Sequence, residues 1–101
     1  MRIEFISVRE IREYQRNQQV TFVDLRDSSD YLKRHIKGAV SMPYEMFLTE
    51  YTSLPRNRIY ILYCDRGATS ILAASTMQNA GYRVRSLAGG MHEAMKLQAG
   101  T

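Results

Sequence analysis

The hydrophobic pattern of the chain alternates between strand-like runs and helix-like repeats. Residues 59–63 form an uninterrupted apolar run, which predicts a central strand buried on both faces, as in a parallel sheet. Residues 20–25 are rich in β-branched and aromatic side chains and predict a second strand. Two shorter segments, 39–42 and 83–87, are also predicted to be strands.

Helical segments are expected between these strands. Ser7 and Glu10 have the spacing of a capping box, and apolar residues then recur every three positions, which predicts a helix over 8–18. Gly81 is expected at the C′ position of a later helix, and Gly89 and Gly90 are expected to form a turn. The other predicted helices cover 29–35, 45–52, 71–80 and 91–97. Because strand and helix alternate without a linker or repeat, residues 1–101 predict one α/β domain with a mainly parallel sheet.

Composition and charge narrow the function without naming it. The chain has 101 residues, 45% of them hydrophobic and 24% charged, which is typical of one globular core. The formal net charge is +4, but the lysines and arginines are scattered among acidic residues, so we expect no nucleic-acid partner. No stretch approaches the ~18 apolar residues of a membrane span, and no signal segment is recognisable, so no membrane partner and a cytoplasmic location are expected.

Cys64 is the single cysteine and therefore cannot form an internal disulfide. It follows the predicted central strand and precedes a predicted helix, which is where α/β sheets bind ligands. Backbone N–H groups of the following loop are expected to converge on an anion, with Gly67 allowing the tight curve. The field of the helix N-terminus, up to ~2 kcal/mol, favours a reactive thiolate. Alternatively, Cys64 is a small buried residue, and the residues alone leave both interpretations open.

Several segments in order resemble the rhodanese, or sulfurtransferase, family. Val23-Asp24-Leu25-Arg26 resembles its V-D-x-R strand end, and residues 35–39 resemble its H-I-x-G-A element, with the expected proline at Pro43. Residues 63–70 resemble its active-site loop, and 81–82 and 87–91 its closing signature. The resemblance implies a three-layer fold with a mainly parallel five-stranded sheet and helices on both faces.

The resemblance also implies that Cys64 is the nucleophile of a sulfurtransferase or sulfur carrier. Cys64 would accept sulfane sulfur from thiosulfate or a persulfide donor, a small anion, and pass it to an external thiol or cyanide, without metal or cofactor. Asp24 and Arg26 are expected to support the site structurally, with Asp24 bracing the loop. The expected substrate-binding residues are Asp65, Arg66, Gly67, Ala68, Thr69 and Ser70.

Individual side chains in the motif have more than one interpretation. Arg66 is expected to attract the donor, but Asp65 beside it cancels that charge, so persulfide and polysulfide donors rank level with thiosulfate. Thr69 either donates its hydroxyl to the sulfur or caps the helix, and capping is the commoner outcome. His35 is expected to be a structural hydrogen-bonding residue, and His92 has no assigned role.

Two rival functions and one departure from the family remain. A phosphatase of the rhodanese-like type needs an arginine six residues after the cysteine, and Ser70 occupies that position. A non-catalytic module for protein interaction or reactive-sulfur sensing stays an alternative. The tryptophan often found four residues after the paired glycines is replaced by Ala94, which places the packing of the last helix in question.

Overall fold

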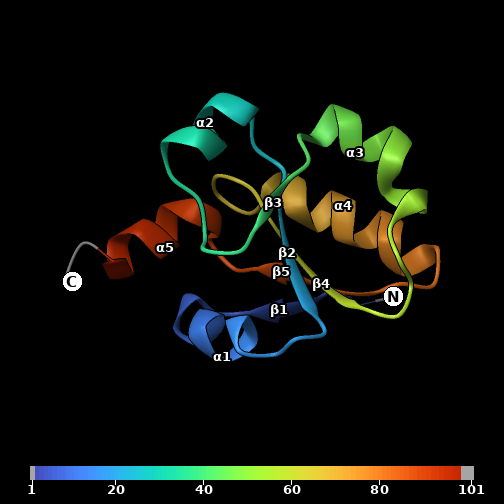
Figure 1. Ribbon diagram of the computed structural model, residues 1–101, viewed down its shortest axis with the longest axis horizontal. Helices are drawn as coiled ribbons and strands as arrows, with labels where there is room; N and C mark the ends of the chain where they lie inside the picture. The colour runs from blue at the N-terminus through green and yellow to red at the C-terminus, as the bar shows by residue number, and fades with distance from the viewer. Residues whose placement is uncertain (1, 99–101) are drawn as a thin grey trace.

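The computed structural model describes residues 2–98 and is organised around one five-stranded sheet (Figure 1). The strands lie in the order β1-β5-β4-β2-β3, and every neighbouring pair is parallel. The predicted α/β class and the five-stranded parallel sheet are therefore confirmed. The strands are β1 (Glu4–Ile6), β2 (Val20–Asp24), β3 (Val40–Ser41), β4 (Ile59–Tyr63) and β5 (Arg83–Leu87).

Helices cover both faces of the sheet, as predicted. One face carries the 3-10 helix η1 (Val8–Glu10), α1 (Ile11–Gln15) and α5 (Gly90–Gln98), while α3 (Tyr44–Glu50) and α4 (Ala68–Asn79) cover the other. The short α2 (Ser28–Lys33) and the 3-10 helix η2 (Tyr51–Ser53) complete the layers. Within residues 2–98, no helix has both the length and the hydropathy needed to cross a membrane.

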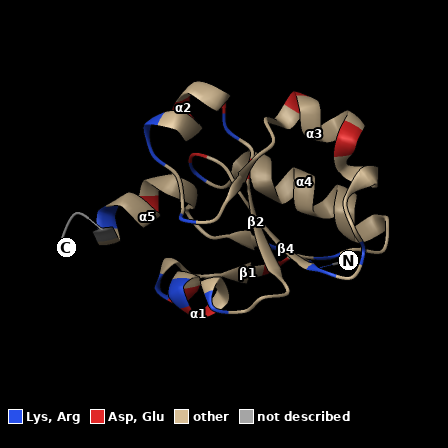
Figure 2. Cartoon of the chain, in the orientation of Figure 1, with Lys and Arg blue, Asp and Glu red and all other residues tan. Residues whose placement is uncertain are grey.

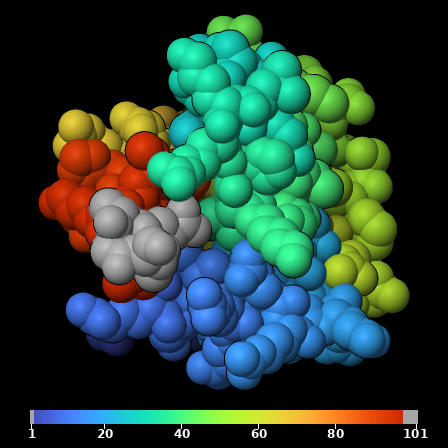
Figure 3. Space-filling model, turned by 60° about the vertical axis from the view of Figure 1, so that its left-hand side comes forward, coloured from blue at the N-terminus to red at the C-terminus, as the bar shows by residue number. Residues whose placement is uncertain are grey.

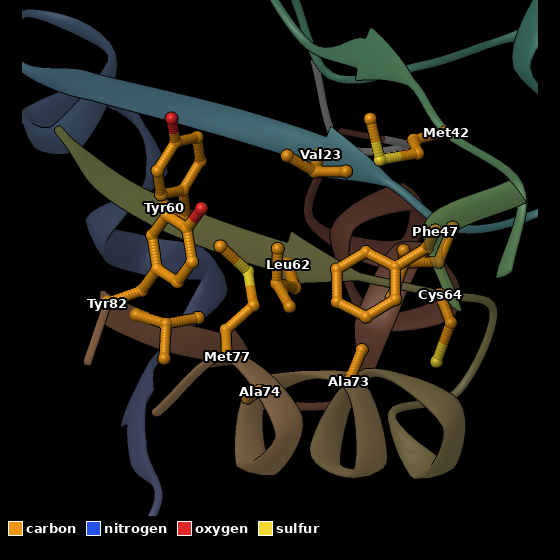
Figure 4. Packing of buried hydrophobic residues seen from close by; sticks show 12 residues of the cluster. Val23, Met42, Phe47, Tyr60, Leu62, Cys64, Ala73, Ala74, Met77 and Tyr82 are labelled. Atoms are coloured by element: carbon orange, nitrogen blue, oxygen red, sulfur yellow. The ribbon is translucent and has the colours of Figure 1, made fainter. Parts of the chain in front are cut away.

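β4 separates two hydrophobic clusters. Tyr60 and Leu62 point into the cluster beneath α3 and α4, whereas Ile61 and Tyr63 point into the cluster beneath α1 and α5. All four side chains are almost fully buried, so the apolar run marks a strand covered on both faces. Figure 4 shows the first cluster, with Cys64 at the end that lies beside the first turn of α4.

Two helix boundaries follow the capping chemistry predicted from the sequence. The Ser7 N–H donates to Glu10 Oε1 at 2.8 Å, and the capping box is complete, although it starts a 3-10 turn that continues into a short α1. At the end of α4, the Gly81 N–H donates to the Gln78 carbonyl at 3.0 Å. The Tyr82 N–H donates to the Met77 carbonyl at 3.0 Å, which completes a Schellman motif.

Two further differences from the sequence prediction affect the edge of the sheet and the start of α4. β1 was not predicted, because it is a three-residue edge strand with two of its residues exposed and so gives no readable alternation. α4 begins at Ala68, three residues earlier than predicted, because Gly67 precedes it with a φ of 110° and turns the chain directly into the helix. The consequence is that Ala68, Thr69 and Ser70 belong to the first turn of α4 rather than to a loop.

Candidate active site

Cys64 lies immediately after the central strand β4, at the carboxyl edge of the parallel sheet. Its Sγ accepts a hydrogen bond from the Gly67 N–H at 3.1 Å and a second from the Ser70 N–H at 3.4 Å. The residue is only 6% exposed and is a free thiol. The sulfur therefore lies at the bottom of a turn of backbone amides, within reach of a narrow group only.

The first turn of α4 supplies the electrostatic environment of this sulfur. The first N–H groups of a helix have no carbonyl partner within the helix, and the Cys64 sulfur takes the place of that acceptor for Ser70. The helix N-terminus carries partial positive charge, and two of the N–H groups there point at the sulfur. Two amides of the turn, those of Gly67 and Ser70, donate to the sulfur, and anion binding by residues 65–70 stays a prediction.

The N-terminus of α5 braces the same turn from behind. The Met91 N–H donates to the Cys64 carbonyl and the His92 N–H to the Asp65 carbonyl, both at 2.9 Å. Gly90 makes this approach possible, because a Cβ at that position would lie 2.5 Å from the Cys64 carbonyl oxygen. The sequence marked Gly89 and Gly90 only as a turn, whereas Gly90 is the first residue of α5 and a contact of the active-site backbone.

A pair of buried hydroxyls lies behind the turn. Ser70 and Ser86 are both fully buried, and their Oγ atoms are 2.7 Å apart. The Ser70 hydroxyl also donates to the Gly67 carbonyl at 3.2 Å. Ser86, on β5, thereby ties the sheet to the two residues whose N–H groups reach the sulfur. Sequence reasoning missed Ser86, because nothing in a strand residue 16 positions after Ser70 signals this contact.

The charged side chains of the turn point away from the sulfur. Asp65 and Arg66 are 74% and 71% exposed, and their side chains form a loose ion pair at 3.9 Å. This pairing agrees with the expectation that Asp65 offsets the charge of Arg66 at the mouth of the site. Neither side chain forms a hydrogen bond to Cys64 among the described residues.

Ala68 and Thr69 occupy the outer side of the first turn of α4. Ala68 is exposed and Thr69 is half-buried. The prediction that Thr69 caps the helix is wrong, because Gly67 is the N-cap residue and makes no side-chain cap. Since α4 starts so early, the Thr69 side chain is past the capping position. Its hydroxyl also forms no hydrogen bond to Cys64 in the described part of the chain.

Asp24 and Arg26 form a buried ion pair near the neighbouring end of β2. Arg26 Nη2 lies 2.7 Å from Asp24 Oδ2, and Arg26 Nη2 also donates to the Arg34 carbonyl at 2.6 Å. The hydrogen bond to Asp24 raises the pKa of Arg26 above its usual value. The structural role of both residues fits this arrangement. However, the Asp24 carboxylate contacts Arg26 and not the Cys64 turn, so the expected brace of that turn is provided by α5 and Ser86 instead.

Tyr63 fixes the segment that follows Arg34. Its hydroxyl accepts a hydrogen bond from the Ile36 N–H at 3.1 Å, and burial raises the pKa of Tyr63 well above its usual value. His35, next to Ile36, stacks on Tyr31 with ring centroids 3.8 Å apart, and its Nδ1 lies 2.8 Å from the Tyr31 carbonyl oxygen. The hydrogen bond expected of His35 is present, and its structural role stays a prediction.

No group of three or more histidine, cysteine, aspartate or glutamate side chains in residues 2–98 is arranged to hold a metal ion. His92 contributes its backbone N–H to the brace described above, and its side chain forms no hydrogen bond in this part of the chain. The chemistry of the site therefore centres on one sulfur and the amides around it.

The model of the rhodanese-like domain family matches residues 7–96 of the chain, which include every residue of the site. The chain belongs to the rhodanese-like domain family. A rhodanese-related protein from Thermoplasma volcanium has the same fold, with a TM-score of 0.86 at 18% identity over 93% of this chain and 92% of that one. Membership of the rhodanese-like family rests on the match of the family model, and the solved structure shows that the fold is shared.

Several curated relatives of this rhodanese-like chain are named sulfurtransferases, and another is named an HTH-type transcriptional regulator. A sulfurtransferase from Allochromatium vinosum is 29% identical over 75 residues, which are 73% of this chain and 70% of the relative. A tRNA sulfurtransferase from Desulfurococcus amylolyticus is 29% identical over 69 residues, which are 68% of this chain. The chain spans only 14% of the length of the latter relative. These relatives support a sulfurtransferase family. The activity of each full-length relative is a property of that relative and is not assigned to this chain.

Proposed function

We propose that this chain is a sulfurtransferase or sulfur carrier in which Cys64 holds a persulfide between a donor and an external acceptor. The observation that carries the proposal is the position of Cys64 Sγ. This sulfur accepts hydrogen bonds from the N–H groups of Gly67 and Ser70 at the N-terminus of α4. Such a position stabilises an anionic sulfur both before and after loading.

The loading step balances without a redox partner. The Cys64 thiolate attacks the outer, sulfane sulfur of thiosulfate, a new S–S bond forms, and the old S–S bond breaks. The bonding electron pair leaves with sulfite, so one thiolate anion and one thiosulfate dianion give one persulfide anion and one sulfite dianion. With a persulfide donor, the leaving group is the donor's own thiolate.

The unloading step regenerates the free thiolate. An acceptor thiolate, or cyanide, attacks the outer sulfur of the Cys64 persulfide, and the electron pair of that S–S bond returns to Cys64. Cys64 is the single cysteine of the chain, so the acceptor thiol comes from another molecule. A thiol that must stay reduced in this cycle fits the reducing conditions of the cytosol.

The mouth of the site does not favour a doubly charged donor strongly. The exposed side chains of Asp65 and Arg66 neutralise one another at 3.9 Å, and exposed ion pairs of this kind contribute little attraction. The backbone amides favour an anion, but they do not distinguish a singly charged donor from a doubly charged one. We therefore keep persulfide and polysulfide donors level with thiosulfate.

A phosphatase is disfavoured by the residue at position 70. A phosphate clamp needs an arginine whose guanidinium faces the bound group. Ser70 is fully buried, and its hydroxyl is engaged by Gly67 and Ser86. The side chain at this position thus supports the turn from within.

The test is the intact mass of the purified protein before and after incubation with thiosulfate and, separately, with a persulfide donor. We expect a gain of one sulfur atom that cyanide or dithiothreitol removes. Cys64→Ser is the matched control, because it keeps the shape of the side chain and removes the nucleophile; it should gain nothing. No gain with either donor contradicts the proposal and favours a non-catalytic interaction or sensing module. A gain with one donor only identifies the donor class.

A further inference from the structure

A groove lies on the surface between the N-terminal helical segment and α5, away from the Cys64 sulfur. Its volume is about 720 Å³, within the usual range of ligand sites. α5 packs against η1, and Figure 3 shows the red α5 and the blue N-terminal segment side by side on this surface. Ala94 and Leu97, which line the groove, follow Gly90 by one and two turns of α5. The groove is therefore separate from the turn that holds the sulfur.

The groove has an aliphatic lining. Val8 and Ile11 contribute from the N-terminal segment, and Ala94 and Leu97 contribute from α5. Ala94 is small and almost fully buried, so it leaves the space above it open, while Leu97 is 41% exposed. Four aliphatic side chains favour an apolar group from a ligand and give a nucleobase or sugar nothing to stack on.

The remaining wall of the groove is positively charged. Arg12, Arg16 and Lys37 line it, and no carboxylate does. Within residues 2–98 none of these three side chains forms an ion pair or a hydrogen bond, whereas Arg26, Arg66 and Arg85 are each paired with a carboxylate. Figure 2 shows basic positions on α1. The groove therefore presents three uncompensated cations beside an apolar surface.

The cations are spread along the groove rather than focused on one point. Arg12 and Arg16 lie on the same face of the N-terminal segment, one helical turn apart. Lys37 is held next to this segment, because Gln15 Nε2 donates to its backbone carbonyl at 3.0 Å. A ligand with a single anionic head group would use one of these cations, while a chain with several carboxylates uses them all.

We propose that this groove binds an acidic amphipathic segment of a partner protein. The apolar face of the segment contacts Ile11, Ala94 and Leu97, and its carboxylates contact Arg12, Arg16 and Lys37. Helices that lie in grooves are recognised in this way, by apolar anchors one turn apart and flanking charges. The inference does not depend on the persulfide chemistry of Cys64.

The probe is a fluorescein-labelled peptide of about 16 residues, long enough to form a helix on binding, with leucines on one face and glutamates elsewhere. Fluorescence anisotropy measures its affinity, which we expect to be in the range of about 1–100 µM. A peptide of the same composition, with the leucines scattered around the helix, should bind at least about tenfold more weakly. This comparison removes attraction due to net charge alone, which matters because the chain carries a formal charge of +4.

Two variants locate the site. Arg12→Glu with Arg16→Glu should weaken binding at least about tenfold. The matched control is Arg2→Glu with Arg83→Glu, which changes the net charge equally at two exposed residues outside the groove and should change the affinity less than about threefold. Ala94→Trp should fill the groove and abolish binding, provided that its thermal unfolding stays cooperative.

Three results would overturn the inference. The first is no peptide binding at about 1 mM protein. The second is equal binding by the scattered peptide, or an equal loss of affinity in the two charge-reversal variants, which would reduce the effect to net charge. The third is tighter binding of a single-stranded RNA oligonucleotide or of decanoate than of the amphipathic peptide, which would assign the groove to another class of ligand.

Discussion

Replacing Ser86 with alanine removes the hydroxyl that holds the back of the Cys64 turn. Each serine hydroxyl has one proton to donate. Ser70 gives its proton to the Gly67 carbonyl, so Ser86 is the donor across the 2.7 Å contact with Ser70 Oγ. In Ser86→Ala, the fully buried Ser70 oxygen loses this donor.

The expected cost follows from burial. A buried hydrogen bond contributes about 1 kcal/mol, and leaving a buried acceptor unsatisfied costs about 1–3 kcal/mol. We expect Ser86→Ala to lower the free energy of unfolding by about 1–2 kcal/mol, which corresponds to a fall in Tm of about 4–8 °C per kcal/mol for a domain of this size. The Ser70 N–H is already 3.4 Å from Cys64 Sγ, so a looser Ser70 weakens that contact further. Sulfur loading and alkylation of Cys64 should slow by about two- to fivefold.

Two measurements check this prediction: urea unfolding, with unchanged m, and the rate of Cys64 alkylation near neutral pH. Ser41→Ala is the matched control. Ser41 also lies on a strand, but its buried Oγ has no hydrogen-bond partner within residues 2–98, so its removal should be neutral or stabilising. If Ser86→Ala is no less stable than Ser41→Ala, the hydroxyl pair does not contribute to stability as described. If stability falls but alkylation does not slow, Ser86 supports the fold and does not position the amides around the sulfur.

Three further predictions concern the surroundings of the site. Burial raises the pKa of Tyr63 above the value of about 10 that it has in the unfolded chain. The stability contributed by the neutral hydroxyl is therefore fully present below about pH 10 and is lost as the pH rises above it. From pH 9 to pH 11, the free energy of unfolding in urea should fall by about 1.4 kcal/mol more for the wild-type protein than for Tyr63→Phe. Asp24→Asn breaks the buried pair with Arg26 and should cost about 3 kcal/mol, measured by the urea midpoint. Gly90→Ala places a Cβ 2.5 Å from the Cys64 carbonyl oxygen and should cost at least about 2 kcal/mol and slow sulfur loading.

Each of these predictions has a control and a refuting result. Equal pH slopes for wild type and Tyr63→Phe would show that this hydroxyl does not titrate with unfolding. Lys96→Gln removes the exposed ion pair with Glu93 and should cost less than about 1 kcal/mol of unfolding free energy. An equally small cost for Asp24→Asn would contradict the stabilising role given to the Asp24–Arg26 pair. Gly38→Ala is the control for Gly90→Ala, because Gly38 also has a positive φ, of 88°, but open space where a Cβ would lie. An equal loss of unfolding free energy in the two variants would assign the cost to backbone strain alone.

Local sequence patterns were sufficient where an element's own residues fix its conformation. The strands at residues 59–63 and 83–87 were predicted with the bounds that the structure has. The first is an uninterrupted apolar run, and the second is marked by the glycines at positions 81, 89 and 90 on either side of it. The C′ position of Gly81 was also predicted correctly from the sequence. β1 was not, since a three-residue edge strand is held by its pairing with β5 and not by its own sequence.

The candidate site divides in the same way. Cys64, the turn after it and the helix that follows are contiguous in sequence, so the position of the sulfur and the turn of amides around it could be predicted from residues 63–70 and the resemblance they carry. The contacts that hold this turn come from Ser86, Met91 and His92, which are 16 or more positions from the residues they contact. Nothing in the local pattern of those residues signals such a contact.

The sequence alone predicted the α/β fold class, the position of the central strand and the place of Cys64 between that strand and a helix, because each of these can be read from the pattern of neighbouring residues. The tertiary structure decided which amides donate to the Cys64 sulfur and that Asp24 pairs with Arg26 rather than with the turn. It also decided that Ala94 lines a basic groove between the N-terminal helical segment and α5, which are far apart in the sequence. These features depend on where the helices that connect the strands pack against the sheet. That placement is set by the summed packing of both hydrophobic clusters and not by any one segment.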